Sequence, residues 1–437
     1  MLFNLLENRI FIKSFIKNKY KMRTLYKNIS RLTLGFVVSL GLLTLASCND
    51  NPDAFVLTDG VPEVQYIRLP DVLSADSLVT RAFMGKTIAI VGKNMTSVKE
   101  VWFNDQKTVL NTSLITSTAL ITTVPTVIPN VVTNKIYLIN KNNDTIKVDF
   151  LVDVPAPLVN SMQCEYVAAG EIATIRGNFF LSVAGSENPE VVFTPNIKAA
   201  DIVSFNINEI KVRVPSGAQE GPVSVVSRYG STRSKFWFRD NRGIILDWDN
   251  LNANGGWRSG VISNSNPVAG ITGNYVKFSG SMTADPSASW NEDAFSFNLW
   301  GSANGRPDGD LFSIAPEKAL LKFEINVTKA WKSGAMQMIF TPWATSGTNS
   351  YLADGATARG LWMPWKSTGT YTTDGWETVT IALKDFKYNH TGEALSLPSA
   401  GNWGGLTFFL WHGGEQAKGE DCTPEICIDN IRVVPAE

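Results

Sequence analysis

Tryptophan is the residue type in this chain that is best suited to ligand chemistry, and it is concentrated in one part of the sequence. Eleven of the 13 tryptophans lie between Trp248 and Trp411. An indole ring is flat and apolar, so it can stack against the C–H face of a sugar ring and leave the sugar hydroxyl groups to polar side chains. The distribution indicates that the last 197 residues bind a ligand with flat apolar faces.

The local sequence around each tryptophan separates candidate ligand contacts from candidate core residues. Binding residues concentrate in loops, where aromatic side chains have less core to join. The leading candidates lie at strand ends or in loops rich in Gly, Ser and Pro, and they are Trp331, Trp343, Trp362 and Trp365, followed by Trp300, Tyr351 and Trp411. Polar partners for sugar hydroxyls would be Arg359, Gln337, Asn298 or Asn349. Trp376, at the start of a strand, is expected in the core, and Trp257 is expected to be structural.

The acidic residues and histidines of the same region show no catalytic pattern. Glycoside hydrolysis requires two convergent carboxyl groups, but the acidic candidates are loop residues without an arrangement that selects a pair: Asp293, Asp308, Asp310 and Glu415. His390 and His412 lack the spacing of metal ligands, and no serine lies in a nucleophile-elbow motif. We expect a non-catalytic binding protein; a glycan-active hydrolase or lyase and a protein-binding adhesin are the alternatives.

Cofactors and disulfides are weakly indicated. We expect no cofactor; a structural calcium ion is the alternative, because carboxylate oxygens suit calcium and Asp247, Asp249 and Asp429 belong to the terminal strands. Cys422 and Cys427 could pair in an oxidising compartment or could be small apolar strand residues. Cys164 is expected to be a buried thiol.

The N-terminus has the features of a lipoprotein signal. Residues 9–31 contain eight Lys or Arg, and the following stretch, 32–45, is almost entirely apolar. Fourteen residues span about 21 Å as a helix, which is too short to cross a membrane permanently. Leu45-Ala46-Ser47-Cys48 resembles the bacterial lipobox, so we expect a signal peptide over residues 1–47, with Met22 the better start, and a lipid on Cys48.

The charge of the mature chain argues against nucleic-acid binding. Removing residues 1–47 leaves 31 basic and 39 acidic residues, whereas a protein that neutralises phosphates needs a positive contact face. Residues 48–60 are predicted to be a flexible tether. Their acidic start, Asn49–Asp53, resembles the export signal of surface-exposed lipoproteins of Bacteroidota, which implies an outer-membrane, cell-surface location.

Two segments of the chain, residues 61–153 and 154–240, form an internal repeat. The matching stretches are Gly85–Asn94 with Gly170–Phe179, Val101–Phe103 with Val191–Phe193, and Val124-Pro125 with Val214-Pro215. They resemble the immunoglobulin-like IPT/TIG fold, so each repeat is predicted to be a small β-sandwich. Pro155 and Pro157 predict a stiff linker. We expect the repeats to be spacers, with Trp102 and Trp237 in their strand cores.

Residues 241–437 are predicted to form a jelly-roll-type β-sandwich, which makes the mature protein all-β. Apolar and polar residues alternate with a period of two at 295–299, 321–327 and 378–383, as in half-buried antiparallel strands. Phe323–Phe340 and Arg359–Tyr371 resemble the C-terminal domain of surface glycan-binding proteins of Bacteroidota polysaccharide-utilisation systems. That resemblance implies a monomeric lipoprotein that presents a polysaccharide to an outer-membrane importer complex, with Trp331 and Trp365 stacking on glucosyl residues of a β-glucan such as xyloglucan.

Overall fold

The computed structural model describes residues 55–254, 261–263, 271–284, 296–300, 306–343, 355–411 and 419–436. Within these ranges the chain is built from β-strands with short 3₁₀ turns and contains no α-helix, as the alternating pattern predicts. No helix in them is long and apolar enough to cross a membrane. Several predictions fall outside these ranges, namely those for the signal peptide, Cys48, Trp257, Asp293, Asn349, Tyr351, His412 and Glu415.

The chain divides into two compact units, with the boundary between Asp153 and Val154. The first unit is a β-sandwich. One of its sheets has the order β1-β3-β6, with β1 at Glu63–Arg68, β3 at Thr87–Lys93 and β6 at Ala119–Thr123. The other has the order β5-β4-β7-β8, with β5 at Gln106–Lys107, β4 at Val98–Phe103, β7 at Lys135–Asn140 and β8 at Thr145–Asp149. A parallel pair, β2 (Arg81–Phe83) and β9 (Leu151–Asp153), completes the unit.

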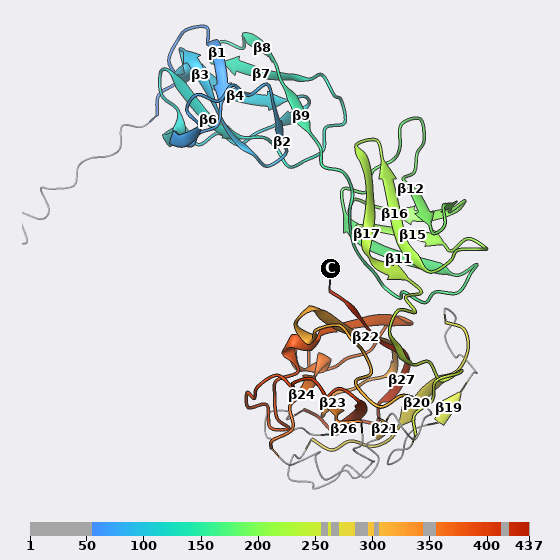
Figure 1. Ribbon diagram of the computed structural model, residues 1–437. Coiled ribbons are helices and arrows are strands. Elements are labelled where there is room, and N and C mark those ends of the chain that lie inside the picture. The colour runs from blue at the N-terminus through green and yellow to red at the C-terminus, as the bar shows by residue number, and fades with distance from the viewer. Residues whose placement is uncertain are drawn as a thin grey trace, which may run out of the picture. The chain divides into compact units, whose positions relative to one another are not determined.

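The second unit starts with another sandwich of two four-stranded sheets (Figure 1). One sheet has the order β10-β11-β15-β14, with strands Leu158–Met162, Ile172–Asn178, Glu209–Arg213 and Ile202–Phe205. The other has the order β13-β12-β16-β17, with strands Ile197–Lys198, Glu190–Phe193, Gly221–Ser227 and Gly230–Phe238.

The predicted repeat is confirmed by one glycine that performs the same task in both sandwiches. A Cβ atom on Gly92 would lie 1.8 Å from the carbonyl oxygen of Glu63, and one on Gly177 would lie 1.8 Å from that of Leu158. In both cases the first strand of the sandwich carries a register shift at this point. The glycine of the repeated motif is therefore required because two backbones approach too closely for any side chain.

The prediction that Trp102 and Trp237 lie in strand cores is wrong. Both indoles are half-buried and belong to neither hydrophobic core, because the neighbouring strand positions, with opposite orientation, supply the core residues. Trp102 Nε1 donates a hydrogen bond of 2.9 Å to Glu100. The guanidinium of Arg242 lies 3.7 Å from the ring centre of Trp237, a cation–π contact.

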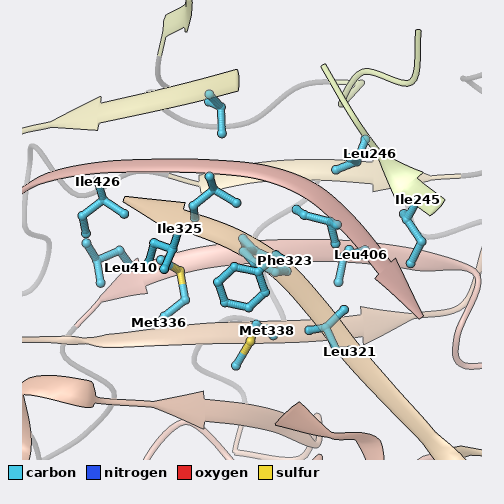
Figure 2. Close-up of a cluster of buried hydrophobic side chains, with 14 of the residues drawn as sticks. Ile245, Leu246, Leu321, Phe323, Ile325, Met336, Met338, Leu406, Leu410 and Ile426 are labelled. Carbon is cyan, nitrogen blue, oxygen red and sulfur yellow. The ribbon is translucent and has the colours of Figure 1, made fainter. Parts of the chain in front are cut away.

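The C-terminal domain is a two-layer antiparallel sandwich, as predicted. Its larger sheet has the order β19-β20-β27-β22-β25, with strands Val261–Ser263, Tyr275–Ser279, Glu425–Pro435, Ala319–Lys329 and Glu377–Ala382, and β18 (Ile244–Leu246) also pairs with β27. The smaller sheet has the order β21-β26-β23-β24, with strands Ser296–Trp300, Gly405–Trp411, Ala335–Thr341 and Arg359–Trp362. Figure 2 shows the core between the layers, where Phe323 of β22 lies near Met336 and Met338 of β23 and Leu406 of β26.

The hydrophobic core of the second sandwich also contains residues of the C-terminal domain. Ile271, Tyr275, Trp376 and Cys427 of the C-terminal domain belong to the same buried cluster as the core of the second sandwich. Backbone hydrogen bonding also joins the two, since Thr378 N donates to Gln163 O at 2.7 Å. The predicted burial of Trp376 is confirmed, but the side chain is buried against the second sandwich rather than in the core of its own domain.

Four charged side chains form a buried cluster at the same junction, which we call the junction ion cluster: Glu165, Lys322, Glu324 and Arg432. Glu165 of the second sandwich pairs with Lys322 at 2.6 Å and with Arg432 at 2.7 Å, and Arg432 pairs with Glu324 at 2.7 Å. Burial alone would lower the pKa of Arg432, but the two carboxylates outweigh it and the net pKa is raised. The second sandwich is therefore packed firmly against the C-terminal domain, and its role as a spacer stays a prediction.

The structure tests the predictions for three of the four cysteines. Cys164, Cys422 and Cys427 are all unpaired, so Cys422 and Cys427 form no disulfide. Cys427 is buried in β27 and belongs to the shared core, whereas Cys422 packs against the core between the two sheets. Cys164 is a buried thiol, as expected.

Candidate functional site

The structure places Trp331 and Trp365 in the core, which corrects their predicted exposure at strand ends or loops. Their side chains are 0% and 3% exposed. Trp331 Nε1 donates to the carbonyl oxygen of Ser333 at 2.5 Å, and Trp365 Nε1 donates to that of Gly334 at 2.8 Å. A buried indole whose N–H is satisfied by the backbone presents no face for stacking on a ligand.

Trp362 is half-buried and belongs to the same aromatic group. Its ring makes edge-to-face contacts with Trp331, Phe323 and Tyr371 at centroid distances of 5.6, 5.8 and 5.7 Å. Such pairs contribute to packing stability beyond the area that they bury. The tryptophans at 331, 362 and 365 therefore close one corner of the sandwich rather than forming an open binding surface.

The outward face of the smaller sheet has the composition of a binding surface. On β23 the side chains of Met336, Met338 and Phe340 enter the core, so the alternate positions, Gln337, Ile339 and Thr341, lie on the other face. An apolar cluster of Ile339, Phe409 and Trp411 is separate from the core. Ile339 and Phe409 are 0% and 3% exposed, so the chain itself covers them, whereas Trp411 at the end of β26 is half-buried and is the more accessible aromatic residue of this face.

Gln337 and Arg359 meet on that face. Arg359 Nη1 donates to Gln337 Oε1 at 2.8 Å, and Arg359 Nε donates to the carbonyl oxygen of Thr357. Both side chains are fully buried, and their role as polar partners for sugar hydroxyls stays a prediction. Gln337 Nε2 has no hydrogen-bond partner among the described residues. Buried amide N–H groups without a partner are rare, and a ligand oxygen is one way to satisfy them.

The strand register aligns further candidates with this pair. Trp411 is half-buried at the end of β26 and is stacked on His390 at a centroid distance of 6.0 Å. One row of paired residues crosses the whole sheet: Asn298 of β21 pairs with Thr407 of β26, Thr407 pairs with Ile339 of β23, and Ile339 pairs with Arg359 of β24. Trp300 of β21 pairs with Gly405 of β26. The candidate site, which we call the small-sheet face, therefore contains Gln337, Arg359, Ile339, Phe409 and Trp411.

A cavity of about 430 Å³ lies at one end of the small-sheet face. It is lined by Thr341 of β23, by residues 356–358 next to Arg359, and by residues 396–399. Trp343 follows directly after this end of β23 and is half-buried. Hydroxyl groups together with apolar residues such as Leu397 and Pro398 suit a neutral polar ligand, and the volume is within the usual range of ligand pockets, about 300–1,000 Å³.

Several carboxylates in the described parts of the C-terminal domain have structural partners. Asp310 accepts the backbone N–H groups of Gly401 and Trp403. Asp247 accepts three backbone N–H groups of the turn that follows it, and Asp249 accepts the backbone and side-chain N–H groups of Asn274. No group of three or more His, Cys, Asp or Glu within the described ranges is placed to hold a metal ion. A structural calcium ion at Asp247, Asp249 and Asp429 stays an untested alternative from the sequence.

Asp429 should make the stability of the domain depend on pH. Burial raises its pKa to about 9, and its Oδ1 accepts the backbone N–H of Asn430. A carboxyl group whose pKa is raised by folding stabilises the fold fully below its unfolded pKa, near 4, and this contribution is lost as the pH rises through about 9. We expect Asp429→Asn to remove a slope of up to about 1.4 kcal/mol per pH unit in this window.

Urea unfolding of both proteins between pH 5 and pH 9, with and without EDTA, measures that slope. Equal slopes for the wild type and Asp429→Asn in EDTA would contradict the prediction. A slope that appears only in EDTA would show that a cation keeps the carboxyl group ionised in the wild type.

Comparison with known proteins identifies the family. Residues 238–435 match the family described as surface glycan-binding protein B xyloglucan binding domain. The chain is 34% identical to the crystal structure of surface glycan-binding protein PbSGBP-B from Prevotella bryantii; the match covers 87% of this chain and 100% of that one, with a TM-score of 0.72. The chain belongs to the surface glycan-binding protein B family.

A curated relative is also similar to part of the chain. An IPT/TIG domain-containing protein of Bacteroides ovatus is 27% identical over 225 residues, which are 48% of this chain. The chain spans 45% of the length of that relative.

Membership in the surface glycan-binding protein B family agrees with the function expected from the sequence. It does not identify the residues that contact the ligand. The sequence named Gln337, Arg359, Trp300 and Trp411, and the register brings these positions to one sheet. It did not single out Ile339, Phe409 or Thr407. The sequence contained a signal for them, because neither β23 nor β26 has a charged residue on either face. A strand without charge on either face is typically buried on both faces, as these two are.

Proposed function

We propose that this surface glycan-binding protein captures a neutral plant β-glucan, of the xyloglucan type, without cleaving it. The observation that carries the proposal is the match of residues 238–435 to the xyloglucan binding domain, together with the identity to PbSGBP-B over its whole length. The guanidinium of Arg359 donates to two neutral acceptors within the chain, the side-chain oxygen of Gln337 and the carbonyl oxygen of Thr357, and this agrees with a neutral ligand at the small-sheet face.

The proposal is tested with the soluble chain, residues 49–437, by affinity electrophoresis against a panel of polysaccharides that includes xyloglucan, mixed-linkage β-glucan, xylan and mannan. Retarded migration in xyloglucan with no release of reducing ends is the expected result. Release of reducing ends would make the protein a hydrolase, and migration unchanged by every glycan would contradict the binding function.

We propose the small-sheet face as the contact surface, with Trp411 as its aromatic residue. Trp411→Ala is expected to weaken xyloglucan binding about thirtyfold, the effect of losing roughly 2 kcal/mol, because a half-buried indole contributes little to the core. Trp376→Ala is the matched control, since its indole is buried at the junction. Isothermal titration and thermal unfolding of both variants check the prediction. A Trp411→Ala variant with wild-type affinity would exclude Trp411 and leave Trp300, Trp343 and Tyr351 as candidates.

The location and partners are part of the same proposal. We propose that a lipid on Cys48 anchors the monomeric protein in the outer membrane, on the cell surface, where it presents glycan to an outer-membrane importer complex. The family name supports a surface location. Cys48→Ala is expected to release the protein from the membrane fraction or to leave it as a precursor; continued membrane anchoring of this variant would contradict the lipid assignment.

A further inference from the structure

A second hollow in the molecule begins at the junction between the second sandwich and the C-terminal domain and continues along the C-terminal domain. It consists of two cavities, of about 390 and 710 Å³, that share Arg242 and Pro435 in their lining. Each has the size of a ligand pocket, about 300–1,000 Å³. Domain junctions are frequent places for ligand sites. We call the pair the junction cleft.

The walls of the junction cleft combine apolar surface with hydrogen-bonding groups. Met162 and Phe236 of the second sandwich and Val434 of the C-terminal domain are buried apolar residues in the smaller cavity. Asn160, Ser161 and Thr380 are exposed at the same cavity. The larger cavity adds Leu311, Phe312 and Ser313. This mixture suits a ligand with apolar faces and a hydroxyl rim.

Lys322 provides buried donors in the smaller cavity. Its side chain is 7% exposed, and in the described part of the chain its ammonium has one hydrogen-bond partner, Glu165. An ammonium group carries three N–H donors. Buried donors without acceptors are costly, so oxygen atoms of a bound molecule would satisfy the remaining ones.

Four of the five charged residues that line the smaller cavity are paired within the chain, and the fifth, Lys235, is exposed. Glu165 is paired with both Lys322 and Arg432, and Asp240 accepts two hydrogen bonds of 2.9 Å from the side chain of Arg242. The guanidinium of Arg242 is also held against Trp237. A carboxylate ligand would meet Glu165 and Asp240, and a cationic ligand would meet Lys322 and Arg242, whereas a neutral molecule rich in hydroxyl oxygens meets neither conflict.

We propose that the junction cleft is a second glycan-binding site, for a short segment of the same neutral polysaccharide; this inference rests on the proposed function. Lys322 and Thr380 lie on the face of the larger sheet that turns away from the core, so the smaller cavity of the cleft and the small-sheet face are on opposite layers of the C-terminal domain. One polysaccharide molecule bound by both sites would gain affinity through avidity.

The test is the stoichiometry of binding. Thr380→Trp places a large side chain at the mouth of the cleft, on the edge strand β25. The matched control is Ser204→Trp, an exposed residue on the edge strand β14 that does not line the cleft. In isothermal titration with a xyloglucan oligosaccharide, we expect two molecules per chain for wild type and Ser204→Trp and one for Thr380→Trp. Affinity for the polymer should fall about tenfold in Thr380→Trp, equivalent to roughly 1.4 kcal/mol.

Further variants make the outcome decisive. If Thr380→Trp lowers the melting temperature, Ser161→Trp on the opposite wall is titrated instead, with the same expected result. Trp411→Ala should retain one molecule per chain, bound in the cleft. One molecule per chain in the wild type, or two in both blocked variants, overturns the cleft site and leaves the proposed function intact. A wild-type chain that binds no oligosaccharide overturns both.

Discussion

Replacing Arg432 by Met is expected to lower the free energy of unfolding by about 3–5 kcal/mol, the usual cost of leaving buried charges without a partner. The guanidinium of Arg432 is fully buried and bonds to Glu324 and Glu165, which belong to different domains. After the substitution Glu324 retains only the hydroxyl of Thr378 as a side-chain partner. Chemical unfolding of residues 49–437 measures the loss.

Arg213→Met is the matched control for this prediction. Arg213 pairs with Asp201 at 3.0 Å, but both side chains are about half exposed, and an exposed ion pair contributes about 0–1 kcal/mol. If Arg432→Met and Arg213→Met lowered stability by the same small amount, the junction ion cluster would not hold the two domains together. A large loss for Arg432→Met alone would show that the junction ion cluster stabilises the fold of residues 154–437.

The strands and the repeat could be predicted because their signals are local. Alternation of period two follows from the strand geometry itself. The glycine of the repeated motif, Gly92 in the first sandwich and Gly177 in the second, is required because two backbone segments approach closely there. The junction could not be predicted in this way. Lys322 and Glu324 occupy the polar positions of an alternating strand and therefore suggest solvent exposure. Their burial depends on Glu165, which is more than 150 residues away in the sequence.

The wrong predictions at the candidate site have the same cause: the side chains that bury a residue come from segments that are distant in the sequence. Trp331 is surrounded in sequence by Lys, Ser and Gly, a pattern typical of an exposed loop, but Tyr371 and Trp362 come from distant segments and cover it. Gln337 and Arg359 were proposed from their residue types as polar partners of a sugar, and their contact with a ligand stays a prediction. Their hydrogen bond to each other, and the missing partner of Gln337 Nε2 among the described residues, depend on the pairing of β23 with β24 and could not be derived from the sequence alone.

Trp331→Ala and Trp365→Ala are each expected to lower stability by about 3–5 kcal/mol, the cost of truncating a buried tryptophan. Each also removes the N–H group that satisfies a backbone carbonyl, at Ser333 or Gly334. Thermal unfolding should show a strongly reduced melting temperature, while the fraction that remains folded at low temperature should bind xyloglucan with near wild-type affinity. Trp331→Phe, which retains an aromatic ring but not the N–H group, should lose less stability. An unchanged melting temperature together with affinity about thirtyfold weaker, the effect of roughly 2 kcal/mol, would instead place these indoles on the glycan.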